Sequence, residues 1–129
     1  MKKDLRVLKT KASLQTALIE ILQEKKLDKI SISELCKLAN VNRGTFYLHY
    51  RDVTELFEEY FHEMTEDFKE AYYEPYRLTD FKIENMSADM IGIFHHVEKY
   101  KQCYKIVFDR KTPMRYYYLL FDIIRTYLK

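Results

Sequence analysis

The sequence contains very few of the residues that interrupt helices or cross-link a chain. Its 129 residues include two glycines, two prolines, two cysteines and no tryptophan. A many-stranded sheet needs many tight turns, so this scarcity of turn formers favours an all-α fold. Cys36 and Cys103 stand far apart in the sequence, and we interpret them as free thiols rather than as a disulfide framework.

Long apolar runs and targeting signals are also missing. No run of 18 apolar residues occurs, so the sequence predicts no transmembrane span and no membrane partner. Residues 1–11 are basic and lack both the apolar region and the cleavage site of a signal peptide. We therefore expect a cytoplasmic protein.

The sequence motifs of catalysis do not occur either. There is no glycine-rich phosphate loop, no GxSxG motif and no metal-ligand cluster, so we expect neither enzymatic activity nor a cofactor. His62, His95 and His96 stand without an HExxH or paired CxxC motif, which favours surface or pocket histidines over a metal site. The acidic pairs at 58–59 and 66–67 fit the solvated face of a helix.

Charge is unevenly distributed along the chain. The whole chain has a net charge of +2, but residues 1–51 hold 11 Lys or Arg and 5 Asp or Glu, a net charge of +6. Residues 52–129 hold 11 Lys or Arg and 15 Asp or Glu, a net charge of −4. A basic first part followed by an acidic second part suits nucleic-acid binding at one end. The same split also occurs by chance on solvated surfaces.

Apolar residues at helical spacing predict the first and the longest helix. We expect frayed first residues and a firm helix from about Thr10, with a buried stripe of Leu14, Ala17, Leu18, Ile21 and Leu22. Leu27 and Ile30 should pack inward. Asp52, with Glu55 three residues later, predicts a capping box for a long helix. This helix should end near residues 72–73, because Pro75 follows.

The remainder of the chain predicts two or three further helices. Ser87 is a suitable cap for a helix that carries Met90, Ile91, Phe94 and Val97, and a short helix should cover residues 100–108. Gly92 inside the first of these helices allows a close helix approach. Thr112 as cap and Pro113 as first helical residue predict a last helix from Met114 to about Leu128.

Residues 33–50 predict two short helices joined by a tight turn. Ser33 is a suitable cap for the first of them, which carries apolar residues at 35, 38 and 39. Asn40 tolerates the left-handed backbone that such a turn needs, and Val41 should pack between the helices. Asn42 can cap a second helix that begins at Arg43. Together these features form a helix-turn-helix.

This stretch resembles the TetR family of transcriptional regulators. The resemblance rests on Gly-Thr-Phe-Tyr at 44–47, His-Tyr at 49–50 and Glu-Leu at 55–56, and it covers roughly residues 10–57. It implies a three-helix DNA-binding domain at 1–52, joined by a long helix to a regulatory and dimerisation domain at 53–129. The second domain is shorter than is typical of the family. Asn40 replaces the usual turn glycine, and Val53 replaces a lysine that meets a phosphate in the family.

The resemblance implies a sequence-specific DNA-binding regulator, usually a ligand-responsive repressor, that reads a near-palindromic double-stranded operator. Arg43, Thr45 and Tyr47 would face bases or nearby phosphates. The residues expected to hold the DNA backbone are Lys9, Lys11, Ser33, His49, Tyr50 and Arg51. Asn42 belongs to the same candidate DNA-binding site as the cap of the second helix. The alternative is a helical protein-interaction module that retains the motif without binding an operator.

The second domain is rich in tyrosine and phenylalanine. Most of these residues are best interpreted as core or interface, but a tyrosine-lined cavity for an aromatic or amphipathic effector is the functional alternative. Its candidate lining is Tyr60, Met64, Met90, Phe94, Tyr104, Tyr117 and Phe121. A single recognition helix covers few base pairs, so we also expect a homodimer. The last helix should supply its interface through Tyr116, Leu120, Ile123, Ile124 and Tyr127.

Overall fold

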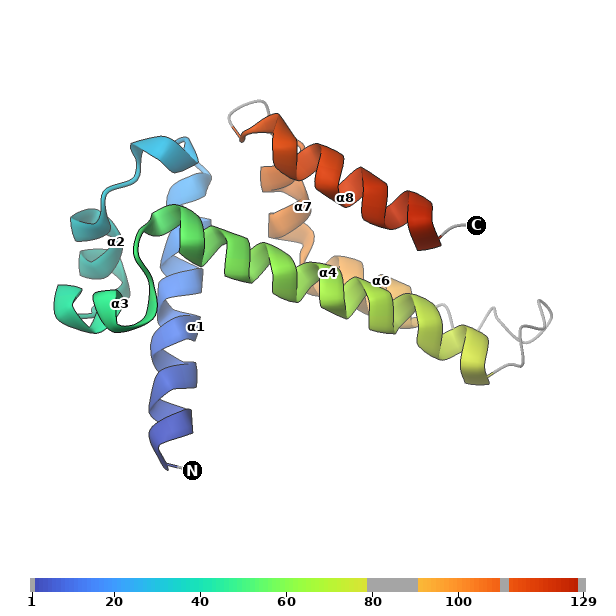
Figure 1. Ribbon diagram of the computed structural model, residues 1–129, viewed down its shortest axis with the longest axis horizontal. Helices are drawn as coiled ribbons and strands as arrows, with labels where there is room; N and C mark the ends of the chain where they lie inside the picture. Colours follow the sequence, from blue (N-terminus) through green and yellow to red (C-terminus); the bar gives the residue numbers. More distant parts are fainter. Residues whose placement is uncertain (1, 79–90, 110–111, 128–129) are drawn as a thin grey trace. The chain divides into compact units, whose positions relative to one another are not determined.

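A computed structural model describes residues 2–78, 91–109 and 112–127 (Figure 1). The described residues form helices and connecting turns and contain no strand, as the scarcity of glycine and proline predicted. The chain divides into two units, Met1–Tyr60 and Phe61–Lys129. The division falls inside the helix that covers Val53–Leu78. Within the described ranges, none of the helices combines the length and the apolar character that a membrane span requires.

Unit 1 consists of three helices, a 3₁₀ turn and the first turns of a fourth helix. These are α1 (Lys2–Leu22), η1 (Leu27–Lys29), α2 (Ile32–Ala39), α3 (Arg43–His49) and α4 (Val53–Leu78). The predicted stripe of α1 forms part of the core: Leu14, Ala17, Leu18 and Leu22 are buried, and Ile21 is half-buried. Leu27 and Ile30 are buried as predicted. Leu35, Phe46, Leu56 and Phe57 complete this core.

The prediction that α1 begins near Thr10 was wrong. The helix begins at Lys2. Residues 2–9 contain no glycine or proline and consist mainly of Lys, Arg and Leu, which have high helix propensity. A hydroxyl residue at position 10 therefore does not start the helix.

Unit 2 consists of the remainder of α4 with α6 (Ile91–Lys99), α7 (Lys101–Val107) and α8 (Met114–Tyr127). The short helix predicted at residues 100–108 is confirmed, with Tyr100 and Phe108 as its flanking residues. Ser87 and Met90 lie outside the described residues. The side chain of Thr112 donates to the carbonyl of Ile106, and the last helix begins at Met114 as predicted.

Helix α4 also continues past its predicted end. It passes through Pro75 and ends at Leu78. Proline lacks the N–H that would bond to the carbonyl of Ala71, so it removes one hydrogen bond close to the end of the helix. Gly92 of α6 lies against this carbonyl, and a methyl group at Gly92 would be 3.6 Å from its oxygen. This is an ordinary van der Waals distance, so the packing does not require a glycine at this position, unlike the close approach that the sequence suggested.

Candidate nucleic-acid interface

Helix α2 begins with a cap at Ser31, whereas the cap had been predicted at Ser33. Ser31 Oγ accepts a hydrogen bond from Glu34 N–H at 3.0 Å, and Glu34 Oε1 accepts one from Ser31 N–H at 3.0 Å. This reciprocal pair needs an acidic residue three positions after the serine. Ser33 has Cys36 at that position, so Ser33 lies in the first turn, exposed. Lys25 Nζ donates to the other Glu34 oxygen at 2.8 Å.

The turn between α2 and α3 has the predicted backbone. Asn40 adopts the left-handed conformation at φ 57° and ψ 45°, which closes α2 in place of a glycine. The N–H of Val41 bonds to the carbonyl of Cys36 at 2.9 Å, and the Val41 side chain is half-buried. Asn42 Oδ1 accepts from Gly44 N–H at 2.8 Å, which confirms Asn42 as the cap of α3. A methyl group at Gly44 would lie 3.3 Å from that oxygen, so a larger residue would press on the cap.

Helix α3 separates its inner and outer faces clearly. Phe46 and Tyr50 are 0% and 3% exposed, and their rings lie 5.5 Å apart. Thr45 and His49 are half-buried, one turn apart. The remaining positions, Arg43, Gly44, Tyr47 and Leu48, are all exposed. The outer face is therefore available to a partner, whereas the inner face anchors the helix in unit 1.

Arg43 and Tyr47 form a pair on the outer face. Arg43 Nη2 donates to Tyr47 Oη at 3.3 Å, and the guanidinium carbon lies 5.9 Å from the centre of the Tyr47 ring. The hydrogen bond to Tyr47 raises the pKa of Arg43, so the guanidinium stays charged. The two side chains are one helical turn apart, and the contact gives the cation a preferred direction.

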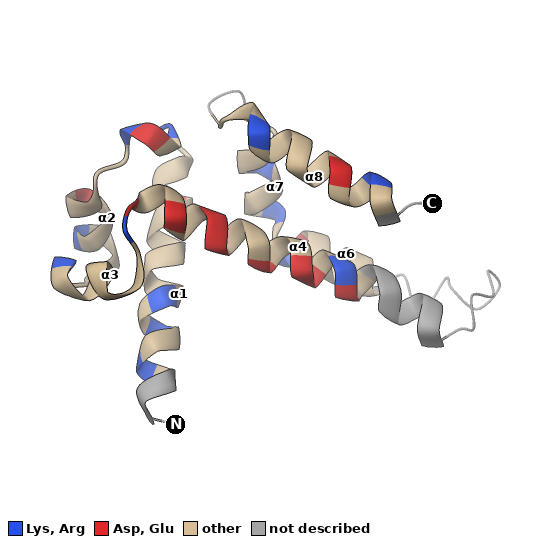
Figure 2. Cartoon of the chain, in the orientation of Figure 1, with Lys and Arg blue, Asp and Glu red and all other residues tan. Residues whose placement is uncertain are grey.

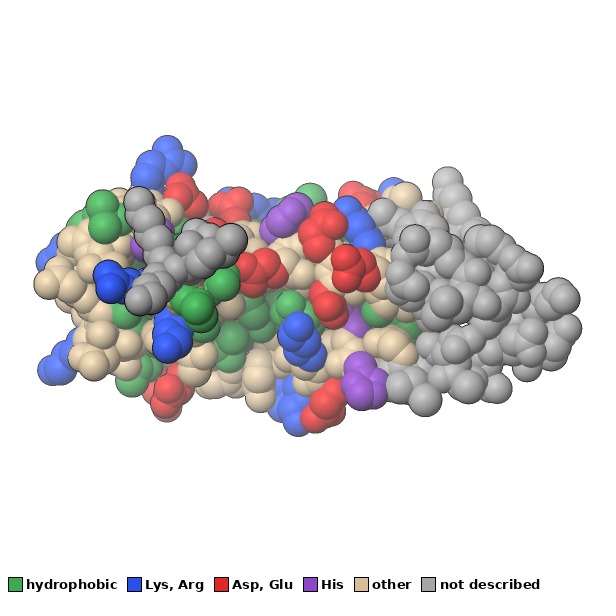
Figure 3. Space-filling view, turned by 90° about the horizontal axis from the view of Figure 1, so that it is seen from below, with side chains coloured by type: hydrophobic (Ala, Val, Ile, Leu, Met, Phe, Trp, Pro, Cys, Tyr) green, Lys and Arg blue, Asp and Glu red, His purple; other side chains and the backbone are tan. Residues whose placement is uncertain are grey.

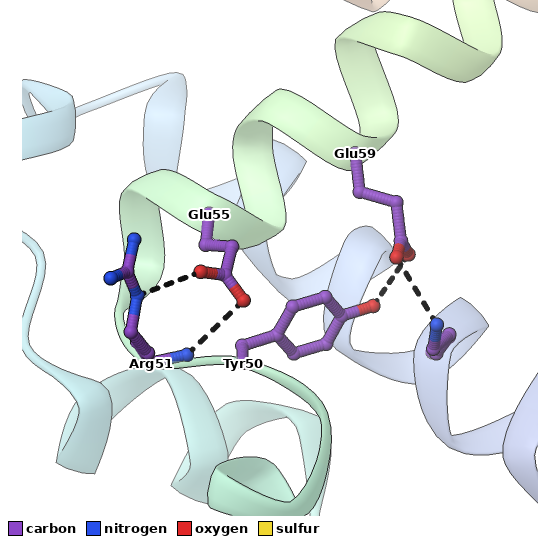
Figure 4. A network of polar contacts seen from close by, with 5 residues as sticks. Tyr50, Arg51, Glu55 and Glu59 are labelled. Atoms are coloured by element: carbon purple, nitrogen blue, oxygen red, sulfur yellow. Dashed lines mark hydrogen bonds and ion pairs between the residues drawn. The ribbon is translucent and has the colours of Figure 1, made fainter.

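Tyr50 turns inward (Figure 4), and Lys11 binds the same carboxylate as Tyr50. The Tyr50 hydroxyl donates to Glu59 Oε1 at 2.6 Å, and Lys11 Nζ pairs with Glu59 Oε2 at 3.1 Å. The Lys11 ammonium also lies 5.5 Å from the centre of the Tyr50 ring. Both residues were expected to hold the DNA backbone. Their polar atoms instead join the end of α3 and the middle of α1 to α4.

The link between α3 and α4 carries an exposed arginine. Arg51 Nε donates to Glu55 Oε2 at 3.0 Å while the Arg51 side chain remains 87% exposed. Asp52 Oδ1 accepts from Glu55 N–H at 2.9 Å, which confirms Asp52 as a cap. The Glu55 carboxylate accepts from Arg51 N–H at 3.4 Å, one residue away from the expected reciprocal partner. Val53 is 5% exposed, so this position belongs to the core and offers no phosphate contact.

The charges on the helices agree with the basic first part and the acidic second part of the sequence. Lys and Arg recur in α1, whereas acidic residues predominate in α4 (Figure 2). Acidic side chains also gather on the face that Figure 3 displays. Lys9 on α1 is exposed, unlike Lys11. Negative charge repels a phosphate backbone, so α4 is unsuited to DNA and α1 and α3 are suited to it.

In unit 2, the expected effector residues have different surroundings. Met64 is fully buried, whereas Phe94 and Phe121 are 66% and 55% exposed. Tyr104 and Tyr117 are half-buried. Met90 lies outside the described residues, and Tyr60 is buried in unit 1. Residues that line an enclosed cavity are mostly buried, whereas the burial of these residues ranges from complete to slight. The effector pocket therefore stays a prediction.

A buried polar network in unit 2 was not predicted from the sequence. His96 is 2% exposed, its Nδ1 lies 2.7 Å from Asp67 Oδ2, and its Nε2 lies 2.6 Å from Tyr104 Oη. A carboxylate only accepts, so Nδ1–H donates to Asp67, and in the neutral ring Nε2 accepts from the tyrosine. Burial raises the pKa of Tyr104 and keeps its hydroxyl protonated. Asp67 was interpreted as part of a solvated face, and no motif marks its partner 29 residues away.

The last helix also differs from its predicted role. Tyr116 and Leu120 were expected in a dimer interface, but each is 1% exposed, and the Tyr116 ring lies 5.5 Å from that of Phe61. These two residues are therefore intramolecular core. Both cysteines are buried, and neither forms a disulfide.

The geometry of unit 1 defines a helix-turn-helix domain of the DNA-binding class, with a capped second helix and an exposed outer face. Residues 15–60 match the family model described as bacterial regulatory proteins, tetR family. Over 56 residues the chain is 39% identical to an uncharacterized HTH-type transcriptional regulator, YxbF, of Bacillus subtilis strain 168. The helix-turn-helix part of this chain is thus similar to the tetR family of bacterial regulatory proteins, in agreement with the resemblance seen in the sequence.

The family model matches only the helix-turn-helix part, residues 15–60. The similarity to YxbF covers 43% of this chain and 15% of YxbF. No solved structure matches the chain significantly. Both the family model and YxbF are described as regulators.

Proposed function

We propose that this protein is a sequence-specific repressor that places α3 in the major groove of an operator. The observation that carries the proposal is the outer face of α3, where Arg43 and Tyr47 are exposed and paired while Phe46 and Tyr50 fix the helix from behind. Arg donates two parallel hydrogen bonds to guanine, and tyrosine hydroxyls bond to bases or phosphates. The contact with Tyr47 holds the guanidinium on the outer face before DNA arrives.

A second set of residues would hold the phosphate backbone. Ser33 lies exposed in the first turn of α2, where free backbone N–H groups favour an anion. Thr45 and His49 lie beside the outer face, and Arg51 and Lys9 are exposed cations. Asn42 is committed to the cap of α3, so we assign it a positioning role. We assign the same role to Tyr50 and Lys11, because both bind Glu59.

We also propose that the protein acts in the cytoplasm as a homodimer on a near-palindromic site. Helix α8 has an exposed apolar stripe of Met114, Tyr118 and Phe121 at spacing i, i+4 and i+7. A second copy would cover this stripe in an interface with twofold symmetry. Sedimentation equilibrium tests this: Phe121→Asp should yield monomers, while Leu119→Asp, on another side of α8, should not. A monomeric wild type at high micromolar concentration would refute the dimer.

A ligand-responsive switch in unit 2 is part of the same proposal. The aromatic supply of this unit, with Tyr104 and Tyr117 half-buried, suits an aromatic or amphipathic effector. A bound effector should raise the thermal stability of the protein and change its affinity for DNA. If neither quantity responds to a broad panel of such compounds, DNA binding is independent of an effector.

Selection from a random pool of duplexes tests the operator function directly. A repressor should enrich one near-palindromic motif, and Arg43→Ala should weaken the enrichment while leaving the helical content unchanged. The rival is a protein-interaction module that keeps the helix-turn-helix as a scaffold. An unenriched pool would favour that rival over DNA binding.

A further inference from the structure

Leu48 is the most exposed large hydrophobic residue in the part of the chain that the structure describes, at 79%. It belongs to α3, and α-helical residues are spaced by about 100° around the axis. The buried residue Phe46 marks the inward direction of α3, and Leu48, two residues later, lies about 200° around the axis from it, on the opposite side. Leu48 therefore occupies the centre of the outer face, between the donors Arg43 and Tyr47 on one side and Thr45 on the other.

The residue one turn before Leu48 is Gly44, so no side chain projects from the helix surface next to Leu48. Long side chains in helices lean over the preceding turn, so the methyl groups of Leu48 extend toward the position where Gly44 has no side chain. An isolated exposed leucine is ordinary on a protein surface. This one differs because the proposed function places its methyl groups nearest to the edges of the base pairs.

The major groove offers one apolar group to such a side chain. Thymine carries a methyl group at C5, whereas the other groups at the base edges are hydrogen-bond donors and acceptors. We propose that Leu48 is a specificity-determining residue that recognises the thymine methyl group. This inference rests on the proposed operator binding, and it adds an apolar contact to the hydrogen bonds of Arg43 and Tyr47.

Replacement of thymine by deoxyuridine tests this contact, because it removes the methyl group and keeps every hydrogen-bonding group. In the selected duplex, each thymine is replaced in turn, and affinities are measured by fluorescence anisotropy. Burial of one methyl group corresponds to an affinity change of about three- to fivefold. We expect wild-type protein to lose this factor at one or two positions in each half-site. Leu48→Ala should bind the unmodified duplex more weakly and be insensitive to the replacement.

Leu119→Ala is the matched control, since Leu119 is an exposed leucine of α8 at 50%. It should keep the wild-type sensitivity to deoxyuridine. The position of Leu48 at the surface predicts an unchanged unfolding temperature for Leu48→Ala, and Leu48→Met should retain part of the sensitivity.

Two results would overturn the assignment while operator binding stands. In one, wild-type protein binds the selected duplex but no replacement weakens it. In the other, Leu48→Ala loses as much affinity on replacement as wild-type protein does, so another residue contacts the methyl group. If no duplex is selected at all, the proposed function fails together with this inference.

Discussion

The hydroxyl of Tyr50 donates a 2.6 Å hydrogen bond to Glu59, which joins the end of the recognition helix α3 to α4. Glu59 also pairs with Lys11 of α1, so one carboxylate connects three helices. The side chain of Glu59 is about one third exposed, and the contribution of this network to stability is correspondingly moderate. Its main consequence is geometric, because it fixes the orientation of α3 within unit 1.

Tyr50→Phe should separate this positioning role from a phosphate contact. The loss of the hydrogen bond should lower the free energy of unfolding by about 1 kcal/mol in urea denaturation. Affinity for DNA should fall slightly, and its dependence on salt should stay the same. A smaller salt dependence without loss of stability would mean that Tyr50 binds a phosphate.

Glu55→Gln should strengthen DNA binding. Glu55 pairs with Arg51, and this negative charge competes with a phosphate for the same guanidinium. Glutamine keeps an oxygen for the N–H of Arg51 but removes the charge. We expect tighter binding to any duplex and a salt dependence that is steeper by up to about one phosphate contact. Arg51→Met is the control, since in that background the Glu55→Gln change should have a much smaller effect.

Glu34→Gln should make the stability of the protein less dependent on pH in acid. The hydrogen bond from Lys25 Nζ, with that from Ser31 N–H, lowers the pKa of Glu34 below its ordinary value of 4.5. A carboxylate with a lowered pKa stabilises the fold above the unfolded pKa, and this stabilisation is lost as pH falls through the folded pKa. Urea unfolding between about pH 6 and 3 should therefore show a smaller decline for Glu34→Gln than for wild type. Glu58→Gln is a control on the exposed side of α4, and an equal effect there would contradict the assignment.

Tyr104→Phe should destabilise unit 2. It removes the hydroxyl that forms a hydrogen bond with Nε2 of His96, and the buried nitrogen then lacks that partner. Such a loss costs about 1–3 kcal/mol. Thermal unfolding measures it, and Tyr118→Phe is the control because Tyr118 is 60% exposed. An unchanged unfolding temperature for Tyr104→Phe would mean that the network contributes no stability.

Local patterns were sufficient to predict the recognition helix and the turn before it. Asn40 and Asn42 act through their own backbone and side chains, so their roles depend on neighbours within a few residues. The division of α3 into a buried and an exposed face follows from the same short range. The predicted cap of α2 was wrong by two residues, because both serines have the chemistry of a cap but only Ser31 has a glutamate three positions later.

The missed features depend on residues that are distant in the sequence. Asp67 and His96 meet only because α4 and α6 pack together, and neither residue departs from a helical pattern. Tyr50 and Lys11 have the chemistry of phosphate ligands, but Glu59 binds both. Tyr116 and Leu120 belong to a helix with apolar residues on several sides, and only its packing determines which side is buried.

The salt dependence of binding to the selected duplex tests the central claim most directly. For wild-type protein, the logarithm of the affinity should fall linearly with the logarithm of the salt concentration between about 50 and 200 mM. The slope should correspond to several phosphate contacts. Arg43→Ala should bind this duplex about 5- to 150-fold more weakly and bind a scrambled duplex almost as wild type does. Equal affinity of the wild type for both duplexes, or binding that salt does not weaken, would contradict an operator-reading helix.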